Sequence, residues 1–149
     1  MINFRYATIS DLDFLVELRI RDLKMFSNQN INQDTINNIK KFYQNGIKRQ
    51  TCFTLLGFDN DNFVASGTLY LYNIMPSNEN LLGRVGQLTN IWVKEEYRHQ
   101  GISTKVVKEL IALKKDECGM VCLNSSHEAK ALYQKIGFKT KENYMVMML

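Results

Sequence analysis

The segment Arg98–Thr104, RHQGIST, carries the residue types of an anion-binding site. Apolar residues recur at helical spacing from Ile102 to Leu113, so a helix is expected to begin near Gly101. The first amide N–H groups of a helix have no internal partner and carry the positive end of its dipole. This first turn contains no acid, and Ser103 and Thr104 add hydroxyl donors. The pattern predicts a cradle for a phosphate or diphosphate; the simpler interpretation is a glycine turn before a capped helix.

The residues around this turn favour the cradle but not a common nucleotide loop. Gly101 lets a ligand approach the backbone or lets the chain adopt a positive φ. Arg98, His99 and Lys105 add positive potential. The sequence contains neither GxGxxG nor GxxxxGK[ST], so a nucleotide-binding regulatory domain is the least favoured function.

Length and composition fit a single domain over residues 1–149. The net charge of +4 is modest and its positive residues are scattered among acids, so no nucleic-acid partner is expected. The three cysteines form no CxxC pair and have no histidine cluster beside them, so no metal site is expected. The N-terminus contains no long apolar segment, so no signal peptide is expected. No apolar run approaches the roughly 20 residues of a membrane span, so a soluble, cytoplasmic protein without a membrane partner is expected.

The periodicity of the sequence predicts a mixed α/β fold. The expected strands are Ile2–Tyr6, Thr51–Phe58, Phe63–Ile74, Arg84–Val93, Gly119–Leu123 and Phe138–Leu149. The expected helices run from a cap at Ser10 to Phe26, over Asp34–Arg49 after a polar break at 28–32, from near Gly101, and over Ser125–Ile136 with a Ser125–Glu128 capping box. The strand–helix–strand from Arg84 to Leu123 is expected to be a right-handed parallel crossover in an otherwise antiparallel sheet with helices on both faces.

Two motifs resemble those of one family. NIWVKEEYRHQGIST resembles the acetyl-CoA-binding motif of the GNAT N-acetyltransferase superfamily, whose pattern Arg/Gln-x-x-Gly-x-Gly/Ala is matched at Arg98 and Gly101, with Ser103 in the last position. LNSSHEAKALYQKIGF resembles the second motif, Asn-x4-Ala-x2-Leu-Tyr-x-Lys-x-Gly-Phe. Its matching residues are Asn124, Ala129, Leu132, Tyr133, Lys135, Gly137 and Phe138. The hairpin segment NFVASGTL and the order of elements also match, whereas Glu95 stands where the family often has proline.

The resemblance implies a twisted, mostly antiparallel sheet whose parallel strand pair is splayed to admit the pantetheine arm of acetyl-CoA. The arm would bind strand backbone at Ile91, Trp92 and Val93. The diphosphate would bind the turn formed by Arg98, His99, Gln100, Gly101, Ile102, Ser103 and Thr104. Asn124 would contact the pantetheine or order a water, unless it is only a turn residue. Tyr133 would protonate the leaving thiolate, the alternative being a core aromatic.

The general base is open at this point, because the strand Arg84–Val93 contains no carboxylate. We expect Thr89 and Asn90 to hold a water that relays the proton from the attacking amine. Glu128 or a residue at the substrate entrance is the alternative.

The acceptor is expected to bind over the first two helices and the hairpin. Its candidate residues are Arg19, Phe26, Tyr43, Tyr70 and Tyr72. Arg19 would bind an acceptor carboxylate or else form a surface ion pair with Glu17 or Asp22. For each aromatic residue the alternative is core packing.

The function expected from this resemblance is acetyl transfer from acetyl-CoA to a primary amine of a small molecule or peptide, by direct attack in a ternary complex. The alternative is a non-catalytic acyl-CoA-binding or sensing module on the same fold. The apolar tail Tyr144–Leu149 is expected to be an internal strand rather than a segment exchanged in a homodimer.

Overall fold

A computed structural model of the chain describes residues 1–28 and 30–149. The expected polar break at 28–32 therefore includes one position, Gln29, outside the described residues. Nine helices and strands follow in the order β1 (Ile2–Tyr6), α1 (Leu12–Ser27), α2 (Gln33–Arg49), β2 (Cys52–Asp59), β3 (Asn62–Asn73), β4 (Arg84–Val93), α3 (Ile102–Lys114), β5 (Met120–Leu123) and α4 (Lys130–Ile136). Short 3-10 turns precede α1, at Ile9–Asp11, and follow β4, at Glu95–Tyr97.

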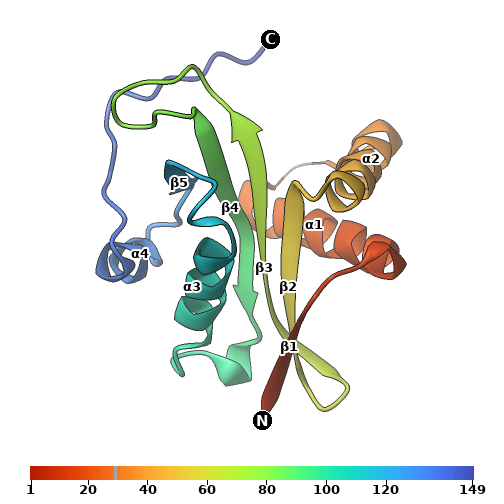
Figure 1. Cartoon of the computed structure of the whole chain (residues 1–149). Coiled ribbons are helices and arrows are strands. Elements are labelled where there is room, and N and C mark those ends of the chain that lie inside the picture. Colours follow the sequence, from red (N-terminus) through yellow and green to blue (C-terminus); the bar gives the residue numbers. More distant parts are fainter. Residues whose placement is uncertain (29) are drawn as a thin grey trace.

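The five strands form one sheet in the order β1-β2-β3-β4-β5. The first three pairs are antiparallel and β4 pairs with β5 in parallel, which confirms the predicted mixed sheet and its crossover through α3. Helices α1 and α2 lie on one face and α3 and α4 on the other (Figure 1). Alternation along β2 separates the two cores, because Leu55 packs with α3 whereas Leu56 packs with α1 and α2.

A bulge interrupts β4 at the centre of the sheet. Thr89 pairs with Thr68 of β3, yet the next pair joins Trp92 to Ser66, so β4 holds one extra residue between the two pairs. Asn90 absorbs the extra length with a φ of 53°, a left-handed conformation that asparagine tolerates. The parallel ladder with β5 ends at the pair Leu88–Leu123, although β4 continues to Val93. The two strands therefore part at the bulge, as the resemblance implied.

Two predicted helix starts are wrong. Ser10 does not cap α1, because the Asp11 carboxylate accepts hydrogen bonds from the Thr8 amide at 2.8 Å and from the Arg5 guanidinium at 2.8 Å. These hydrogen bonds stabilise the 3-10 turn at Ile9–Asp11, so α1 begins only at Leu12.

The last helix begins at Lys130 rather than Ser125. The predicted Ser125–Glu128 capping box does not form, because the Ser125 hydroxyl donates to the Ser126 carbonyl at 2.7 Å. The Ser126 hydroxyl instead accepts from the Ala129 amide at 3.3 Å. The first half of the predicted helix is thus a serine-capped turn.

The predicted strand Phe138–Leu149 is also wrong. Nothing from 138 to 149 is helix or strand, and every side chain of the tail Tyr144–Leu149 is at least 68% exposed. Figure 1 shows the tail leaving α4 and running past the sheet without joining it. Strand propensity alone does not pair a segment, and this one pairs with no strand of the described residues.

Within the described residues, the structure contains no helix that is both long enough and apolar enough to cross a bilayer.

Candidate active site

Helix α3 begins directly after Gly101, as the sequence predicted. Gly101 caps the helix with a φ of 77°, and the first turn contains no acid. Within residues 1–28 and 30–149, no acceptor bonds the amides of Gly101, Ile102, Ser103 and Thr104. A Cβ built on Gly101 would meet nothing within 4 Å, so the space beside this residue is clear. Unpartnered amides, a dipole end and free space together fit an anionic group such as a diphosphate.

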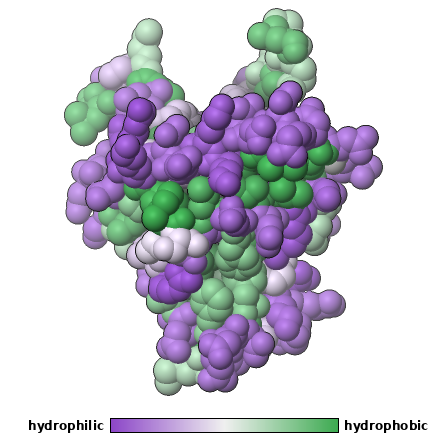
Figure 2. Space-filling model, turned by 90° about the vertical axis from the view of Figure 1, so that its right-hand side faces the viewer, coloured by the Kyte–Doolittle hydropathy of each residue, from purple (hydrophilic) through white to green (hydrophobic). Residues whose placement is uncertain are grey.

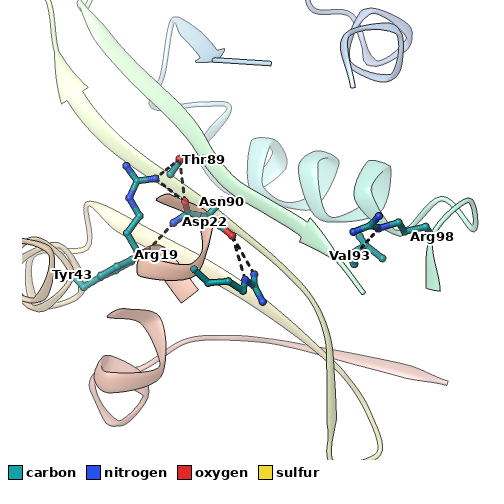
Figure 3. Close-up of polar contacts among 8 residues, drawn as sticks. Arg19, Asp22, Tyr43, Thr89, Asn90, Val93 and Arg98 are labelled. Carbon is teal, nitrogen blue, oxygen red and sulfur yellow. Dashed lines mark hydrogen bonds and ion pairs between the residues drawn. The ribbon is translucent and has the colours of Figure 1, made fainter. Parts of the chain in front are cut away.

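Two charged side chains around this turn, Arg98 and Lys105, are engaged in contacts within the chain. The Arg98 Nε donates to the Val93 carbonyl at 3.0 Å and ties the loop to the end of β4 (Figure 3). The Lys105 ammonium lies 4.7 Å from the centre of the Phe4 ring. The Ile102 side chain is buried in the core, so only its amide can face a ligand. An anion at this turn would therefore meet mainly backbone donors.

The opening between β4 and β5 exposes strand backbone. Beyond Leu88, no strand of the described residues lies beside the edge of β4 that faces β5. The side chains there are fixed elsewhere: Ile91 packs against the α3-side core, and Trp92 stacks on Phe63 with ring centroids 5.2 Å apart. What remains available in the opening is the amide and carbonyl pattern of a strand edge, which can pair with an extended, amide-containing arm.

A pocket of about 360 Å³ lies on the opposite face of β4, against α1 and α2. It brings together five of the predicted site residues: Arg19, Tyr43, Tyr70, Thr89 and Asn90. Its remaining lining residues are Thr35, Asn38, Ile39, Phe42 and Thr68. Figure 2 shows this side of the molecule, where apolar residues form a band between hydrophilic zones.

A polar network joins this pocket to the bulge. The Arg19 Nη1 donates to the Asn90 Oδ1 at 2.8 Å and to the Thr89 Oγ1 at 3.4 Å, and the Asn90 Nδ2 donates to the Tyr43 hydroxyl at 3.0 Å (Figure 3). Neighbouring residues of a regular strand point to opposite faces. Thr89 and Asn90 both face Arg19 because the bulge turns Asn90 out of register. Burial raises the pKa of Tyr43 to about 12, so its phenol stays protonated.

Two predicted acceptor residues lie outside this lining. Phe26, near the end of α1, is 66% exposed. The Tyr72 hydroxyl lies 3.5 Å from the Cys122 sulfur and 3.5 Å from the Gln87 side-chain oxygen. The pocket therefore lies closer to the bulge than expected, because it includes only three of the five candidate acceptor residues.

Tyr133 packs on the other side of the sheet, in the α3-side core. It is 8% exposed, and its ring meets Phe138 edge-on at 5.9 Å. Its hydroxyl has no hydrogen-bond partner among the described residues, and burial raises the pKa of the phenol. Such a phenol is protonated at neutral pH and can donate its proton. Asn124 is exposed directly after β5.

Sequence reasoning missed several lining residues and one buried acid. Thr68 precedes Tyr70 by two positions in β3, so alternation could have placed both on one face. Asp22 follows Leu15 and Leu18 at helical spacing and is only 5% exposed. Its desolvation raises the pKa of the carboxyl group, which the Arg21 guanidinium at 3.3 Å opposes. This pairing also means that Asp22 is not the ion-pair partner of Arg19.

Comparison with known proteins links this geometry to one family. The Acetyltransferase (GNAT) family model matches residues 15–138. No curated protein sequence matches the chain.

Several solved structures share the fold. A predicted acetyltransferase with acetyl-CoA from Clostridium acetobutylicum superposes with a TM-score of 0.89 at 23% identity, covering 99% of this chain and 96% of that one. A GCN5-related N-acetyltransferase from Ralstonia eutropha gives a TM-score of 0.81 at 16% identity, covering 99% of each chain. Glucosamine-6-phosphate N-acetyltransferase from Arabidopsis thaliana gives 0.73 at 20% identity, covering 99% of this chain and 98% of that one.

Proposed function

Because the chain belongs to the GNAT family of acetyltransferases, which use acetyl-CoA, we propose that it is an N-acetyltransferase that acetylates a primary amine of a small molecule or peptide. One observation carries this proposal. At the bulge at Asn90, β4 separates from β5 on one side, and Thr89 and Asn90 extend into a pocket on the other. A donor arm and an acceptor can therefore reach the same point of the sheet from opposite directions.

The backbone supplies most of the donor site. The amides from His99 to Thr104 would hold the diphosphate, with hydroxyls from Ser103 and Thr104 beside them. The strand edge at Ile91–Val93 would align the pantetheine arm, and Asn124, exposed directly after β5, would contact that arm. Arg98 would act chiefly by fixing the loop to Val93. When bound, acetyl-CoA supplies an acetyl group activated as a thioester.

The reaction requires a proton to leave the amine and another to reach the departing sulfur. The amine nitrogen forms a bond to the acetyl carbon while the carbon–sulfur bond breaks, with both substrates bound. Thr89 and Asn90 would hold the water that takes the amine proton into solvent, since no carboxylate lines the pocket within the described residues. Tyr133 would donate its phenolic proton to the thiolate.

Removing the two polar side chains at the bulge tests the water relay. Thr89→Ala combined with Asn90→Ala is expected to lower kcat by roughly 10- to 100-fold at neutral pH, less than the loss of a direct acid or base. Steady-state kinetics with a saturating acceptor measures the effect. Since alanine at a φ of 53° adds strain, Thr89→Ala with Asn90→Gly is the matched control for backbone effects. An unchanged kcat in both double variants rejects the relay.

A non-catalytic acyl-CoA-binding module is the alternative function. The pocket opposite the donor opening favours the enzyme, because a module that only binds acyl-CoA has no need of it. Calorimetric titration with acetyl-CoA, CoA and ATP, followed by a transfer assay, separates the alternatives. Binding of acetyl-CoA with no transfer to any amine would favour the module.

A cytoplasmic location is part of the proposed function. Cys52, Cys118 and Cys122 are all free thiols, which suits a reducing compartment.

We also propose that the exposed tail Tyr144–Leu149 pairs with a second copy of the chain. Strand β5 lies at the edge of the sheet, so one side of it has no ladder partner in the described chain. An open strand edge and a free apolar segment with strand propensity favour association. Addition of the tail of one copy to β5 of the other would give a homodimer. It would cover both the open edge of β5 and the apolar tail.

Charging the tail tests this homodimer. Met145→Lys combined with Met147→Lys keeps the chain length but places two charges on one side of the added strand. Light scattering after gel filtration is expected to show a dimer for the wild type and a monomer for the variant. A monomeric wild type, or an equally stable dimer in the variant, contradicts the tail pairing.

A further inference from the structure

The acceptor pocket contains a single charged side chain among the described residues that line it. This is Arg19, which is half-buried on α1. The other nine lining residues are neutral: Thr35, Asn38, Ile39, Phe42, Tyr43, Thr68, Tyr70, Thr89 and Asn90. The electrostatic character of the pocket is therefore set by one positive charge.

No carboxylate of the described chain forms an ion pair with Arg19, although the buried Asp22 exerts a minor coulombic attraction on it. Its hydrogen-bond acceptors, Thr89 and Asn90, are uncharged. The neighbouring acid, Asp22, forms its ion pair with Arg21. A half-buried charge whose neighbouring acid is paired with another arginine can still gain from an anion supplied from outside the protein.

The Arg19 guanidinium also has N–H donors that bond no acceptor of the described residues. Both hydrogen bonds given above come from Nη1, whereas Nε and Nη2 have no acceptor within residues 1–28 and 30–149. An arginine fork with one nitrogen anchored and two free can bind a carboxylate or phosphate with little loss of side-chain freedom. Asn90 thus holds Arg19 ready for an anionic ligand.

The position of this charge limits where the anion lies in the acceptor. The Arg19 Nη1 is 2.8 Å from the Asn90 side chain, which stands on the bulge. If the amine reacts at the bulge, an anion bound to Arg19 lies only a few bonds from that amine. A charge at the far end of a long acceptor does not satisfy this geometry.

We propose that the acceptor is a primary amine that carries an anionic group close to the amine, an α-amino acid being the simplest form. This inference rests on the proposed function and adds the substrate class. Ile39, Phe42 and Tyr70 supply an apolar wall for the rest of the acceptor, and the last two rings meet edge-on at 5.2 Å. Polyamines and other polycations are disfavoured, because the described lining offers them no carboxylate and one repelling charge.

A panel of matched amines tests the inference in the full-length protein. Each anionic amine is paired with its neutral-bodied analogue: L-phenylalanine with phenethylamine, L-leucine with isoamylamine, and phosphoethanolamine with ethanolamine. Release of CoA gives kcat/KM for each. A charge-assisted hydrogen bond predicts a preference of roughly tenfold or more for the anionic member of at least one pair. The amino-acid and phosphate pairs show which anion is used.

Three variants locate the preference. Arg19→Gln is expected to bring the ratio within a pair close to one, whereas Arg19→Lys keeps part of it because the charge is retained. Lys24→Met removes an exposed charge from the same helix, outside the pocket lining, and is expected to keep the wild-type ratio. A ratio, rather than an absolute rate, is compared because Arg19 also holds Asn90.

The inference and the proposed function can fail separately. Transfer to neutral amines at least as fast as to anionic ones overturns the inference and leaves the acetyltransferase standing. If no amine is acetylated, the proposed function fails, and calorimetric titration of the same anionic amines in the presence of CoA decides the inference. Binding of an anionic member by the wild type and by Lys24→Met, but not by Arg19→Gln, supports it. Equal binding by all three, or no preference for any anionic member, overturns it.

Discussion

Replacing Gly101 with glutamate is expected to weaken acetyl-CoA binding by roughly 100-fold or more, because several charge-assisted hydrogen bonds are lost together. The new side chain would project from the N-terminus of α3 into the clear space beside Gly101. Its carboxylate would compete for the donors that hold the diphosphate and would repel the ligand. Isothermal titration calorimetry with acetyl-CoA measures the change.

Two further substitutions at this position separate the causes. Gly101→Ala adds only strain at a φ of 77°, about 1–2 kcal/mol, because its Cβ meets nothing. Gly101→Gln adds the bulk of glutamate without its charge. We expect affinity to fall in the order alanine, glutamine, glutamate, with thermal melting used to compare stability. Unchanged acetyl-CoA affinity in Gly101→Glu would show that the α3 turn does not bind the diphosphate.

Removal of the Tyr133 hydroxyl is expected to have the largest effect on the rate. Tyr133→Phe should lower kcat by about 10²- to 10⁴-fold, the range of a general acid, while acetyl-CoA affinity changes little. The ring contact with Phe138 survives the substitution, so the core is preserved. Since burial raises the pKa of Tyr133, the wild-type phenol stays protonated across the neutral range, and kcat should not fall there from loss of this proton.

A second tyrosine provides the control for Tyr133. The Tyr97 hydroxyl donates to the Asp59 carboxylate at 2.9 Å and does not line the pocket, although Tyr97 itself directly precedes Arg98. Tyr97→Phe therefore removes a phenol of similar type and is expected to leave kcat within a factor of a few. If Tyr133→Phe behaves like Tyr97→Phe, Tyr133 is a core aromatic, which was the alternative interpretation of its sequence position.

The sequence predicted the elements whose signals are local. Strand β4 was predicted with its observed bounds, because apolar and β-branched residues make up most of the segment Arg84–Val93. The start of α3 followed from Gly101 and the helical spacing after it. The start of α4 and the cap of α1 were missed because each depends on which of several nearby hydroxyl and carboxyl groups takes an amide. The tail was mispredicted because strand propensity alone does not determine whether a segment pairs with an available edge.

The site could be predicted to a similar extent. Its residue types were recognisable, and the α3 turn stands where the motif placed it. The convergence of Thr89 and Asn90 on Arg19 was not predictable, since two adjacent strand residues share a face only when a bulge intervenes. Nothing in the spacing of Arg19 distinguishes a residue that contacts a distant strand from one that pairs with Asp22. That choice is made by the packing of α1 on β4.

The most direct test of the proposed function is a transfer assay that follows both products. The full-length protein is incubated with acetyl-CoA and the matched amine panel, while free thiol and amine mass are recorded together. We predict that CoA appears in equal amount to an amine made heavier by one acetyl group, at a rate reduced in Tyr133→Phe. Tight binding of acetyl-CoA without acetylation of any amine would contradict the enzyme and leave a binding module on the same fold.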